Sequence, residues 1–338
     1  MTFLTRIAVA SIAVTTICAL VACSGPEVAA TDSVVGPRTA EISDPDPEPI
    51  ESAPTPSLPA TVRSFDGVDV TITDTSRIVA ADQYGTLTTT VYALGLGDNL
   101  VGRDTSASFP AVADVTDVTP TGHSLSAEGI LALDPTVVLT DTSIGPRGVQ
   151  DQLRAAGIAV VYFDPTRSMD GVAGQIESVA AALGVPEQGD RLAERTMSEI
   201  AAARALAPTD GEPLKIAFLY MRGSAIKMLA GPGSGADALI EALGATDAGT
   251  ASGVTQQFVA ITSEALIAAA PDVILMMTGG LESIGGIAGL EQVPGIAQTP
   301  AGQSERVVDM ADGVVLSFGP NTGKVLDALA RAVYDPAQ

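Results

Sequence analysis

The sequence predicts an α/β protein with two α/β lobes, each built on a central sheet of parallel type, and a long helical spine that joins them. Three observations lead to this fold class. Short apolar, β-branched runs alternate with stretches of helical periodicity both before and after residues 170–207, and such alternation favours parallel sheets covered by helices. Residues 170–207 are helical in period apart from a turn at 184–186. A turn, a helix and a strand at 119–139 recur 136 positions later, which indicates two related lobes.

The repeated unit carries the only histidine of the chain in its first copy. His123 lies in a Gly-rich turn, and Ser126 is expected to cap the short helix that follows. An Asp-Pro pair then ends the helix before a buried, β-branched strand. The second copy, at 262–275, keeps the helix and the strand but has no histidine. The matched residues are Glu128 and Glu264, Ala132 and Ala268, Pro135 and Pro271, Val137 and Val273, and Leu139 and Leu275.

We expect the first lobe at residues 63–168, the helical spine at 169–208 and the second lobe at 209–338. Strands are expected at 68–72, 78–80, 100–102, 137–138, 160–163, 215–220 and 273–275, with one more ending at 229. Helices outside the repeat are expected at 87–96, 149–156, 236–243 and 323–334. A helical crossing between the lobes, unlike a flexible hinge, would damp large closure motions.

The N-terminal residues predict export. Residues 1–22 contain one positive charge and an apolar run that is short for a membrane span, as in a secretory signal peptide. The run ends in Leu-Val-Ala-Cys, which resembles the bacterial lipobox, so Cys23 is expected to receive a lipid and anchor the protein to the outer face of the cell membrane. Residues 23–62 are rich in proline and acidic residues, and we expect them to form a disordered tether.

Composition excludes several classes of function. The chain has 40 acidic and 17 basic residues and a net charge of -23, which argues against a nucleic-acid partner because phosphates are bound by Lys and Arg. Both cysteines, Cys18 and Cys23, lie near the N-terminus. The folded part therefore has no disulfide and no thiolate metal site.

Enzymatic chemistry finds little support in the motifs. A hydrolase would need a base and a nucleophile elbow of the form G-x-S-x-G, but His123 is the only histidine and the turn at 231–235 has the wrong spacing. The same turn matches a dinucleotide fingerprint only in part, because Pro232 intrudes. It could still offer free N–H groups to an anion at the start of the next helix.

One histidine is enough for a different kind of site. A site for a divalent metal ion requires several His and carboxylate ligands. Iron that is already bound by a macrocycle needs only axial ligands from the protein. His123 could supply one, and Tyr220 of the other lobe could supply the second from the end of a strand. Arg222 would lie on the same side of that strand and stabilise a phenolate, which suits ferric iron. The alternative is that Tyr220 is a half-buried core residue and His123 an ordinary turn residue.

Several motifs together resemble cluster-A substrate-binding proteins of ABC importers, which implies a periplasmic-binding-protein-like fold with a helical spine. The resemblance covers about residues 65–336. It is carried by the segments 74–79 and 93–98, the doubled unit of helix, proline and strand, and the helix after Gly319 and Pro320. Within that class, residues 121–126 (TGHSLS) and 220–223 (YMRG) resemble the haemin-binding lipoproteins of the HmuT type.

This resemblance implies a set of roles. His123 and Tyr220 would be axial ligands from opposite lobes, with Arg222 hydrogen-bonded to the tyrosinate. Glu128 and Glu264 would dock on the permease, one from each lobe. Asn321 departs from the pattern, since many relatives carry an arginine there, which leaves the partners of the haem propionates unassigned. Arg77, Arg103 and the turn at 231–235 are the hypotheses for them.

The expected function is that of an extracytoplasmic, lipid-anchored haemin receptor. It would bind haem b as transported ligand and deliver it to the permease and ATPase of an ABC importer, and surface proteins upstream could donate the haem. The alternative in the same scaffold is a ferric siderophore or cobalamin receptor. A haem-degrading or ester-cleaving enzyme would need a second base, which the sequence does not offer.

Overall fold

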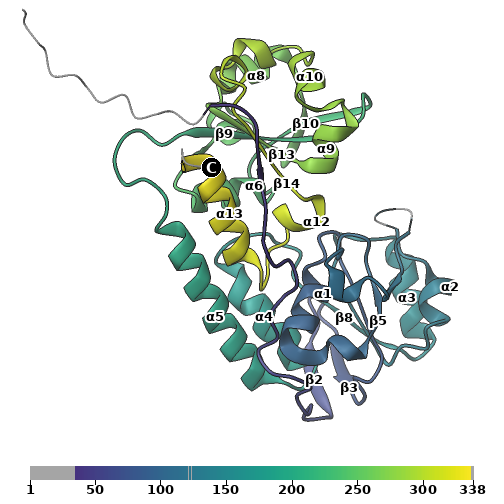
Figure 1. Ribbon diagram of the computed structural model, residues 1–338. Helices are drawn as coiled ribbons and strands as arrows, with labels where there is room; N and C mark the ends of the chain where they lie inside the picture. The colour runs from purple at the N-terminus through teal and green to yellow at the C-terminus, as the bar shows by residue number, and fades with distance from the viewer. Residues whose placement is uncertain (1–34, 121, 123, 336–338) are drawn as a thin grey trace, which may run out of the picture. The chain divides into compact units, whose positions relative to one another are not determined.

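The computed structural model describes residues 35–120, 122 and 124–335. The predicted signal peptide, Cys23 and His123 lie outside these residues. The folded part contains two α/β lobes and a set of helices beside them (Figure 1).

The first lobe is built on a five-stranded sheet in which all strand pairs are parallel. The strands, in spatial order, are β6 (Thr116–Asp117), β5 (Leu100–Arg103), β4 (Ile78–Ala81), β7 (Val137–Thr140) and β8 (Ala159–Tyr162). Its helices are α1 (Thr86–Val91), which continues into a π-helical turn (Tyr92–Leu96), α2 (Ala127–Leu131) and α3 (Arg147–Ala155). A hairpin of β2 (Ala60–Arg63) and β3 (Asp69–Ile72) lies apart from this sheet.

Both faces of this sheet are covered, which explains the near-continuous apolar runs of its central strands. Ile78, Ala80 and Leu139 point to the larger core, shared with α1 and the spine. Val79 and Val138 point to a second core with α2 and α3.

The second lobe has a seven-stranded mixed sheet. β1 (Arg38–Ala40), β14 (Val307–Met310), β13 (Val273–Met277) and β9 (Lys215–Arg222) pair in parallel, and β11 (Thr246–Asp247) also joins β9. β10 (Ile226–Ala230) and β12 (Phe258–Ala260) extend the sheet with antiparallel pairing. The helices are α6 (Ala236–Ala242), α7 (Ala248–Ala251), α8 (Ser263–Ala269), α9 (Thr278–Ser283), α10 (Gly286–Glu291), α11 (Pro300–Gln303) and α12 (Asp312–Val315).

The spine consists of α4 (Gly171–Ala182) and α5 (Pro186–Arg204), and the last helix, α13 (Thr322–Tyr334), packs against it. Helices α13 and α5 pack closely at Gly323 of α13, where a Cβ atom would lie 2.4 Å from the Cβ of Glu199 on α5. Among the described residues, no helix combines the length and apolar character that a membrane span requires.

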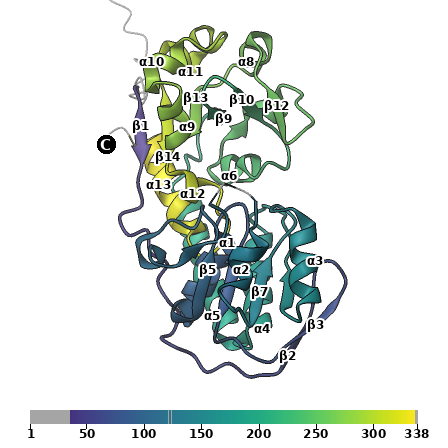
Figure 2. The ribbon, with the colours of Figure 1, turned by 90° about the vertical axis from the view of Figure 1, so that its right-hand side faces the viewer.

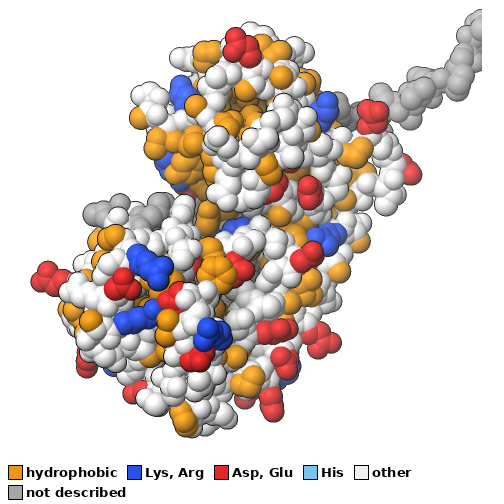
Figure 3. All heavy atoms as spheres, turned by 180° about the vertical axis from the view of Figure 1, so that it is seen from behind, with side chains coloured by type: hydrophobic (Ala, Val, Ile, Leu, Met, Phe, Trp, Pro, Cys, Tyr) orange, Lys and Arg blue, Asp and Glu red, His pale blue; other side chains and the backbone are white. Residues whose placement is uncertain are grey.

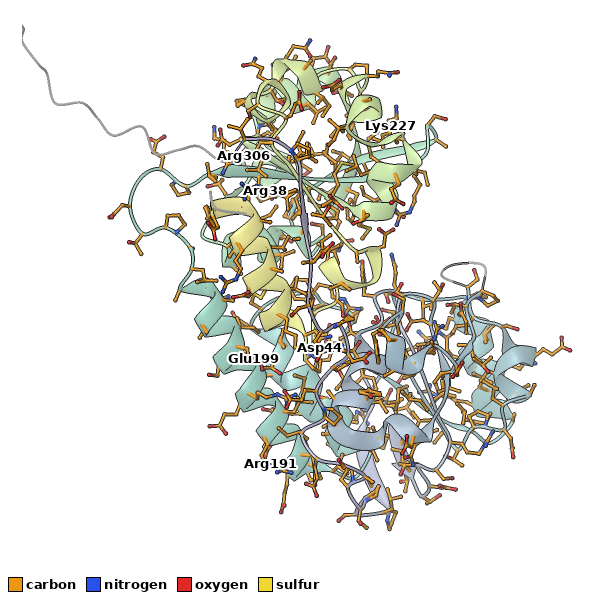
Figure 4. All side chains as sticks on the ribbon, viewed as in Figure 1. Arg38, Asp44, Arg191, Glu199, Lys227 and Arg306 are labelled. Carbon is orange, nitrogen blue, oxygen red and sulfur yellow. The ribbon has the colours of Figure 1, made fainter. Side chains whose placement is uncertain are left out.

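Residues 35–62 differ from the disordered tether that we expected over 23–62. β1 adds to the edge of the second sheet, and β2 pairs with β3 beside the first lobe (Figure 2). Between them, the Ile50 amide donates to the Ala93 carbonyl at 2.7 Å and Lys324 donates to the carbonyl of Asp44 at 3.2 Å. Figure 4 labels Arg38 and Asp44 along this course and Arg191 on α5, and Arg191 forms an ion pair with Glu51.

Composition alone could not predict that residues 35–62 are ordered. A Pro-rich acidic segment cannot bury enough surface by itself to offset the entropy of ordering. These residues instead use apolar surface and a free strand edge that the folded body provides. Ala40, Pro47 and Pro54 are buried in this way.

The internal repeat is visible in the backbone. Ser126 caps α2 by accepting from the Gly129 amide, and Thr262 caps α8 by accepting from the Ala265 amide, both at 3.1 Å. After each helix a residue other than glycine adopts a left-handed conformation, at φ 47° for Asp134 and 41° for Ala270. These two residues are again 136 positions apart, so the two units share their ending as well as their start.

Candidate functional site

The segment that carries His123 follows β6 at the carboxyl edge of the first sheet. Beside the histidine, the Gly122 amide donates to the Thr119 carbonyl at 2.9 Å, and the Leu125 amide donates to the Gly145 carbonyl at 2.7 Å. Gly122 has φ 102°, a conformation that favours glycine. The role of His123 stays a prediction, because the residue itself lies outside the described part of the chain.

Tyr220 and Arg222 lie on the same face of β9, as the Tyr-x-Arg spacing predicts. Met221 between them is fully buried in the core on the other face. The ring of Tyr220 is half-buried and contacts Phe258 of β12 edge-to-face, with centroids 6.1 Å apart and planes at 62°. Two aromatic rings, from the strands on either side of β10, thus form an apolar surface that carries the phenol group of Tyr220.

The guanidinium of Arg222 lies over the ring of Tyr220, with its central carbon 4.7 Å from the ring centroid. Its Nη2 donates to Asp312 at 2.8 Å and to the sulfur of Met277 at 3.4 Å, and its Nη1 donates to the Met221 carbonyl at 3.0 Å. The arrangement differs from the predicted hydrogen bond to the tyrosinate oxygen. Stacking is favoured because the ring face is electronegative and the Asp312 carboxylate holds the guanidinium there.

A buried cluster of charged side chains lies at the carboxyl ends of the strands in the first sheet. Nη2 of Arg167 is 3.3 Å from Asp82 and 3.2 Å from Asp141, and both carboxylates are fully buried. The same guanidinium lies 4.5 Å over the ring of Tyr84. Asp104, also buried, accepts from the Asp82 amide at 3.3 Å.

The sequence-based reasoning missed this cluster. Arg167 is 85 positions from Asp82 and 26 from Asp141, so no local spacing joins them. A usable signal exists, however: Asp82, Asp104 and Asp141 each follow a strand of the first sheet directly. Parallel strands bring such residues to one edge.

Burial dominates the ionisation of these groups. It raises the pKa of Asp104 well above its usual range and also raises the pKa of Asp141, and in both cases the charge of Asp82 adds to the effect. Burial raises the pKa of Tyr84 as well, and the nearby Arg167 guanidinium opposes this rise.

Arg77 and Arg103, the two arginines predicted to bind the haem propionates, lie at opposite edges of the first sheet. Arg77 precedes β4, at the amino edge of the first sheet, and donates to the carbonyl groups of Leu133 and Asp134. It is thus at the wrong edge for a ligand at the carboxyl ends of the strands. Arg103 lies at the carboxyl end of β5 and donates to two backbone carbonyl groups, at 3.0 Å each.

The glycine-rich turn at 231–235 does not offer the free N–H groups that we expected. The carboxylate of Asp237 accepts from the Gly233 amide at 2.6 Å and from the Gly235 amide at 2.9 Å. The chain's own carboxylate thus occupies the anion position. Asn321, buried, donates to the Pro45 carbonyl at 3.2 Å.

Glu128 and Glu264 both lie in first helical turns, in α2 and α8, and both are exposed. Neither carboxylate has an ion pair among the described residues. Elsewhere, acidic and basic side chains are interspersed on the face drawn in Figure 3.

The sequence pattern of the periplasmic binding protein family matches residues 79–313. The chain belongs to this family. The fold class predicted from the sequence pattern is thereby confirmed, and so is the resemblance to substrate-binding proteins of ABC importers. Proteins of this family are substrate-binding components of transport systems, so this protein is a transport component and not an enzyme.

Particular relatives narrow the class. The chain is 27% identical over 282 residues to an uncharacterized ABC transporter substrate-binding lipoprotein, YvrC, of Bacillus subtilis, covering 82% of this chain and 86% of that one. It is 33% identical over 113 residues to a vitamin B12-binding protein of Yersinia pestis, covering 33% of this chain and 40% of that one.

Two solved structures are similar along most of the chain. The crystal structure of the heme binding protein HmuT has a TM-score of 0.84 at 43% identity and covers 89% of this chain and 98% of that one. The periplasmic heme-binding protein RhuT from Roseiflexus sp. RS-1, in its apo form, has a TM-score of 0.72 at 39% identity, with 78% and 100% covered.

Proposed function

We propose that this protein is an extracytoplasmic haemin receptor, anchored to the cell membrane by a lipid on Cys23, that delivers haem to an ABC importer. The observation that carries the proposal is Tyr220 with the Arg222 guanidinium 4.7 Å over its ring, at the end of β9. The similarity to HmuT and RhuT, both named as haem-binding, supports it.

The chemistry of Tyr220 fits ferric iron. A phenolate is a hard, anionic oxygen ligand, which is what ferric iron prefers. A cation over the ring stabilises the charge that spreads into the ring when the proton leaves. The edge-to-face Phe258 ring adds apolar surface for a porphyrin.

His123 is proposed as the second axial ligand, from the opposite lobe. The segment that carries it follows the carboxyl edge of the first sheet, and the turn on either side is fixed by backbone hydrogen bonds. An imidazole is a common haem ligand. Two ligands from two lobes would make haem capture depend on both.

Delivery requires partners that recognise the loaded receptor. We assign Glu128 and Glu264 to the permease of an ABC importer, whose ATPase would drive release, and surface proteins upstream could supply the haemin. The exposure of both carboxylates at matched positions of the repeat supports this assignment. The domain limits proposed above, with the spine at 169–208, place one docking residue in each lobe.

An absorption titration with haemin tests the proposal. The mature protein should bind one haemin with a defined Soret band, and Tyr220→Phe and His123→Ala should each shift that band and weaken binding about tenfold or more. Tyr92→Phe is the matched control, since Tyr92 contacts Phe109 and lies in the π-helical turn of the first lobe. Unaltered spectra for both ligand variants would contradict the ligand assignment.

A cobalamin receptor is the second possibility, favoured by the similarity of residues in one third of the chain to a vitamin B12-binding protein. The same titration with cyanocobalamin distinguishes the two. Saturable binding of cobalamin without a response to haemin would replace the haem proposal. A ferric siderophore receptor would bind neither pigment.

A further inference from the structure

The carboxylate of Asp312 is fixed at both oxygen atoms. Oδ2 accepts from Nη2 of Arg222 at 2.8 Å, and Oδ1 accepts from the Gly279 amide at 2.8 Å. A Cβ atom at Gly279 would lie 2.9 Å from Oδ2, so a glycine leaves room for this contact. Asp312 begins α12, 90 positions after its arginine partner.

The other contacts of Arg222 are weaker anchors. A backbone carbonyl at 3.0 Å and a thioether sulfur at 3.4 Å are neutral acceptors, and sulfur is a poor one. About a third of the Arg222 side chain is exposed to solvent. Without a charged acceptor, the long and flexible side chain of Arg222 would leave the ring and be hydrated by solvent instead.

We propose that Asp312 is a positioning residue for the Tyr220 ligand, which it controls by holding Arg222 over the phenol ring. The inference rests on the proposed function, because it concerns how Tyr220 becomes a ligand. Asp312 touches neither the iron nor the porphyrin in this role. It supplies the geometry that lets the guanidinium stabilise the phenolate.

Two electrostatic effects of Asp312 oppose each other, and distance decides between them. The carboxylate repels a phenolate, but in a partly exposed site that longer-range repulsion is strongly screened by water. The guanidinium lies in contact with the ring, where the attraction is strongest and depends most on position. Holding the cation in place therefore outweighs the repulsion.

The same helix also contacts the first lobe. A Cβ atom at Gly313 would lie 2.1 Å from the Ser106 carbonyl oxygen and 3.0 Å from the hydroxyl of Ser108. The Ser106 amide in turn donates to buried Asp104 at 2.9 Å. Successive residues of α12 thus touch the Tyr220 site and the opposite lobe, so the position of Asp312 depends on the contact between lobes.

A double-mutant cycle tests the inference, with haemin affinity and the pH at which the tyrosinate-type spectrum appears as readouts. Asp312→Asn should weaken haemin binding about threefold to fivefold, the range of a partly exposed ion pair, and should move the spectral transition to higher pH. Arg222→Ala should change both readouts in the same direction and by more. In the Arg222→Ala background, Asp312→Asn should have no further effect, because Asp312 acts through the arginine.

Asp327→Asn is the matched control, since Asp327 forms a similar pair with Arg331 at 2.8 Å, also partly exposed, on α13. It should leave both readouts unchanged. The inference is overturned if Asp312→Asn behaves like this control, if its effect adds fully to that of Arg222→Ala, or if it tightens binding. A spectrum unaffected by Tyr220→Phe would overturn the ligand assignment and this inference together, whereas a Tyr220 effect without an Asp312 effect would overturn this inference alone.

Discussion

Arg167 is the cation that compensates the buried charges of Asp82 and Asp141. It faces two fully buried carboxylates and stacks on Tyr84, while its own side chain is 3% exposed. A carboxylate without its cation in such surroundings bears the full cost of desolvation. The cluster lies under the loops that follow the strands of the first sheet, so it supports the edge at which a ligand is expected.

Replacing Arg167 by methionine should therefore destabilise the protein by about 3–5 kcal/mol at neutral pH. The free energy of unfolding, measured with urea, checks this. Arg331→Met is the control, because its pair with Asp327 is half-exposed and screened by water, so its loss should change the free energy of unfolding far less. Equal effects of the two substitutions would show that Asp82 and Asp141 do not depend on Arg167.

The pH dependence of this effect has a definite sign. Burial already raises the pKa of Asp141, and the nearby Arg167 opposes that rise, so its removal should raise the pKa further. An acid with a raised pKa in the folded state stabilises the fold when it is protonated, and this contribution is lost as the pH rises. The deficit of Arg167→Met should therefore be largest near pH 8 and should shrink as the pH falls toward 5.

At the scale of elements, the two repeated units end in the same strained conformation. Ala270 follows α8 with φ 41° and ψ 55°, where a Cβ atom costs about 1–2 kcal/mol relative to the right-handed region. The conformation turns the chain from the helix into the buried strand β13. Asp134 has the same function before β7.

Ala270→Gly should therefore stabilise the protein by about 0.5–1 kcal/mol, the relief of strain less the greater flexibility of glycine in the unfolded chain. Ala268→Gly, at an exposed position within the same helix, should destabilise it by about 1 kcal/mol. Thermal unfolding of both variants measures the difference. A loss of stability in Ala270→Gly would mean that the left-handed residue is not strained.

These elements also show what sequence can predict. The apolar, β-branched runs of β4, β7 and β13 identify buried strands, because burial on both faces leaves a continuous signal. β1 has three residues and no such signal, since the edge of β14 provides its pairing. A local sequence pattern predicts the structure that a segment favours by itself, but it does not show whether a distant strand has a free edge for pairing.

The same limit divides the residues of the site. Tyr220 and Arg222 are two positions apart on a strand, so the period of the strand predicts that they share a face. Asp312 and Arg167 reach their partners across 90 and 85 positions, and only the fold brings them there. The shared face of Tyr220 and Arg222 was therefore predictable from the sequence, whereas the contacts of Asp312 with Arg222 and of Arg167 with Asp82 were not.

At the scale of the whole molecule, the two lobes are joined by more than the spine. Residues 35–62 run from β1, on the second sheet, to β2, beside the first lobe, and α13 packs on α5. Each crossing limits how far one lobe can move relative to the other. Such a receptor would present its two lobes to a partner at a nearly fixed spacing.

A fixed spacing suits docking through Glu128 and Glu264, one on each lobe. Both are exposed, both follow a side-chain N-cap, and both lie where the helix dipole favours a negative charge. We expect the double variant Glu128→Ala, Glu264→Ala to bind haemin like the parent protein but to abolish haem uptake by cells, because charge complementarity with the permease is lost from both lobes. Each single variant should retain partial uptake.

Glu187 provides the control, since it is also an exposed glutamate in a first helical turn, on the spine helix α5. Glu187→Ala should leave uptake unchanged. Haemin-dependent growth gives the uptake and absorption titration of the purified variants gives the binding, so a folding defect would appear in both measurements and a docking defect only in the first. Normal uptake by the double variant would refute the docking role, and a loss with Glu187→Ala would attribute the effect to total negative charge rather than to two defined positions.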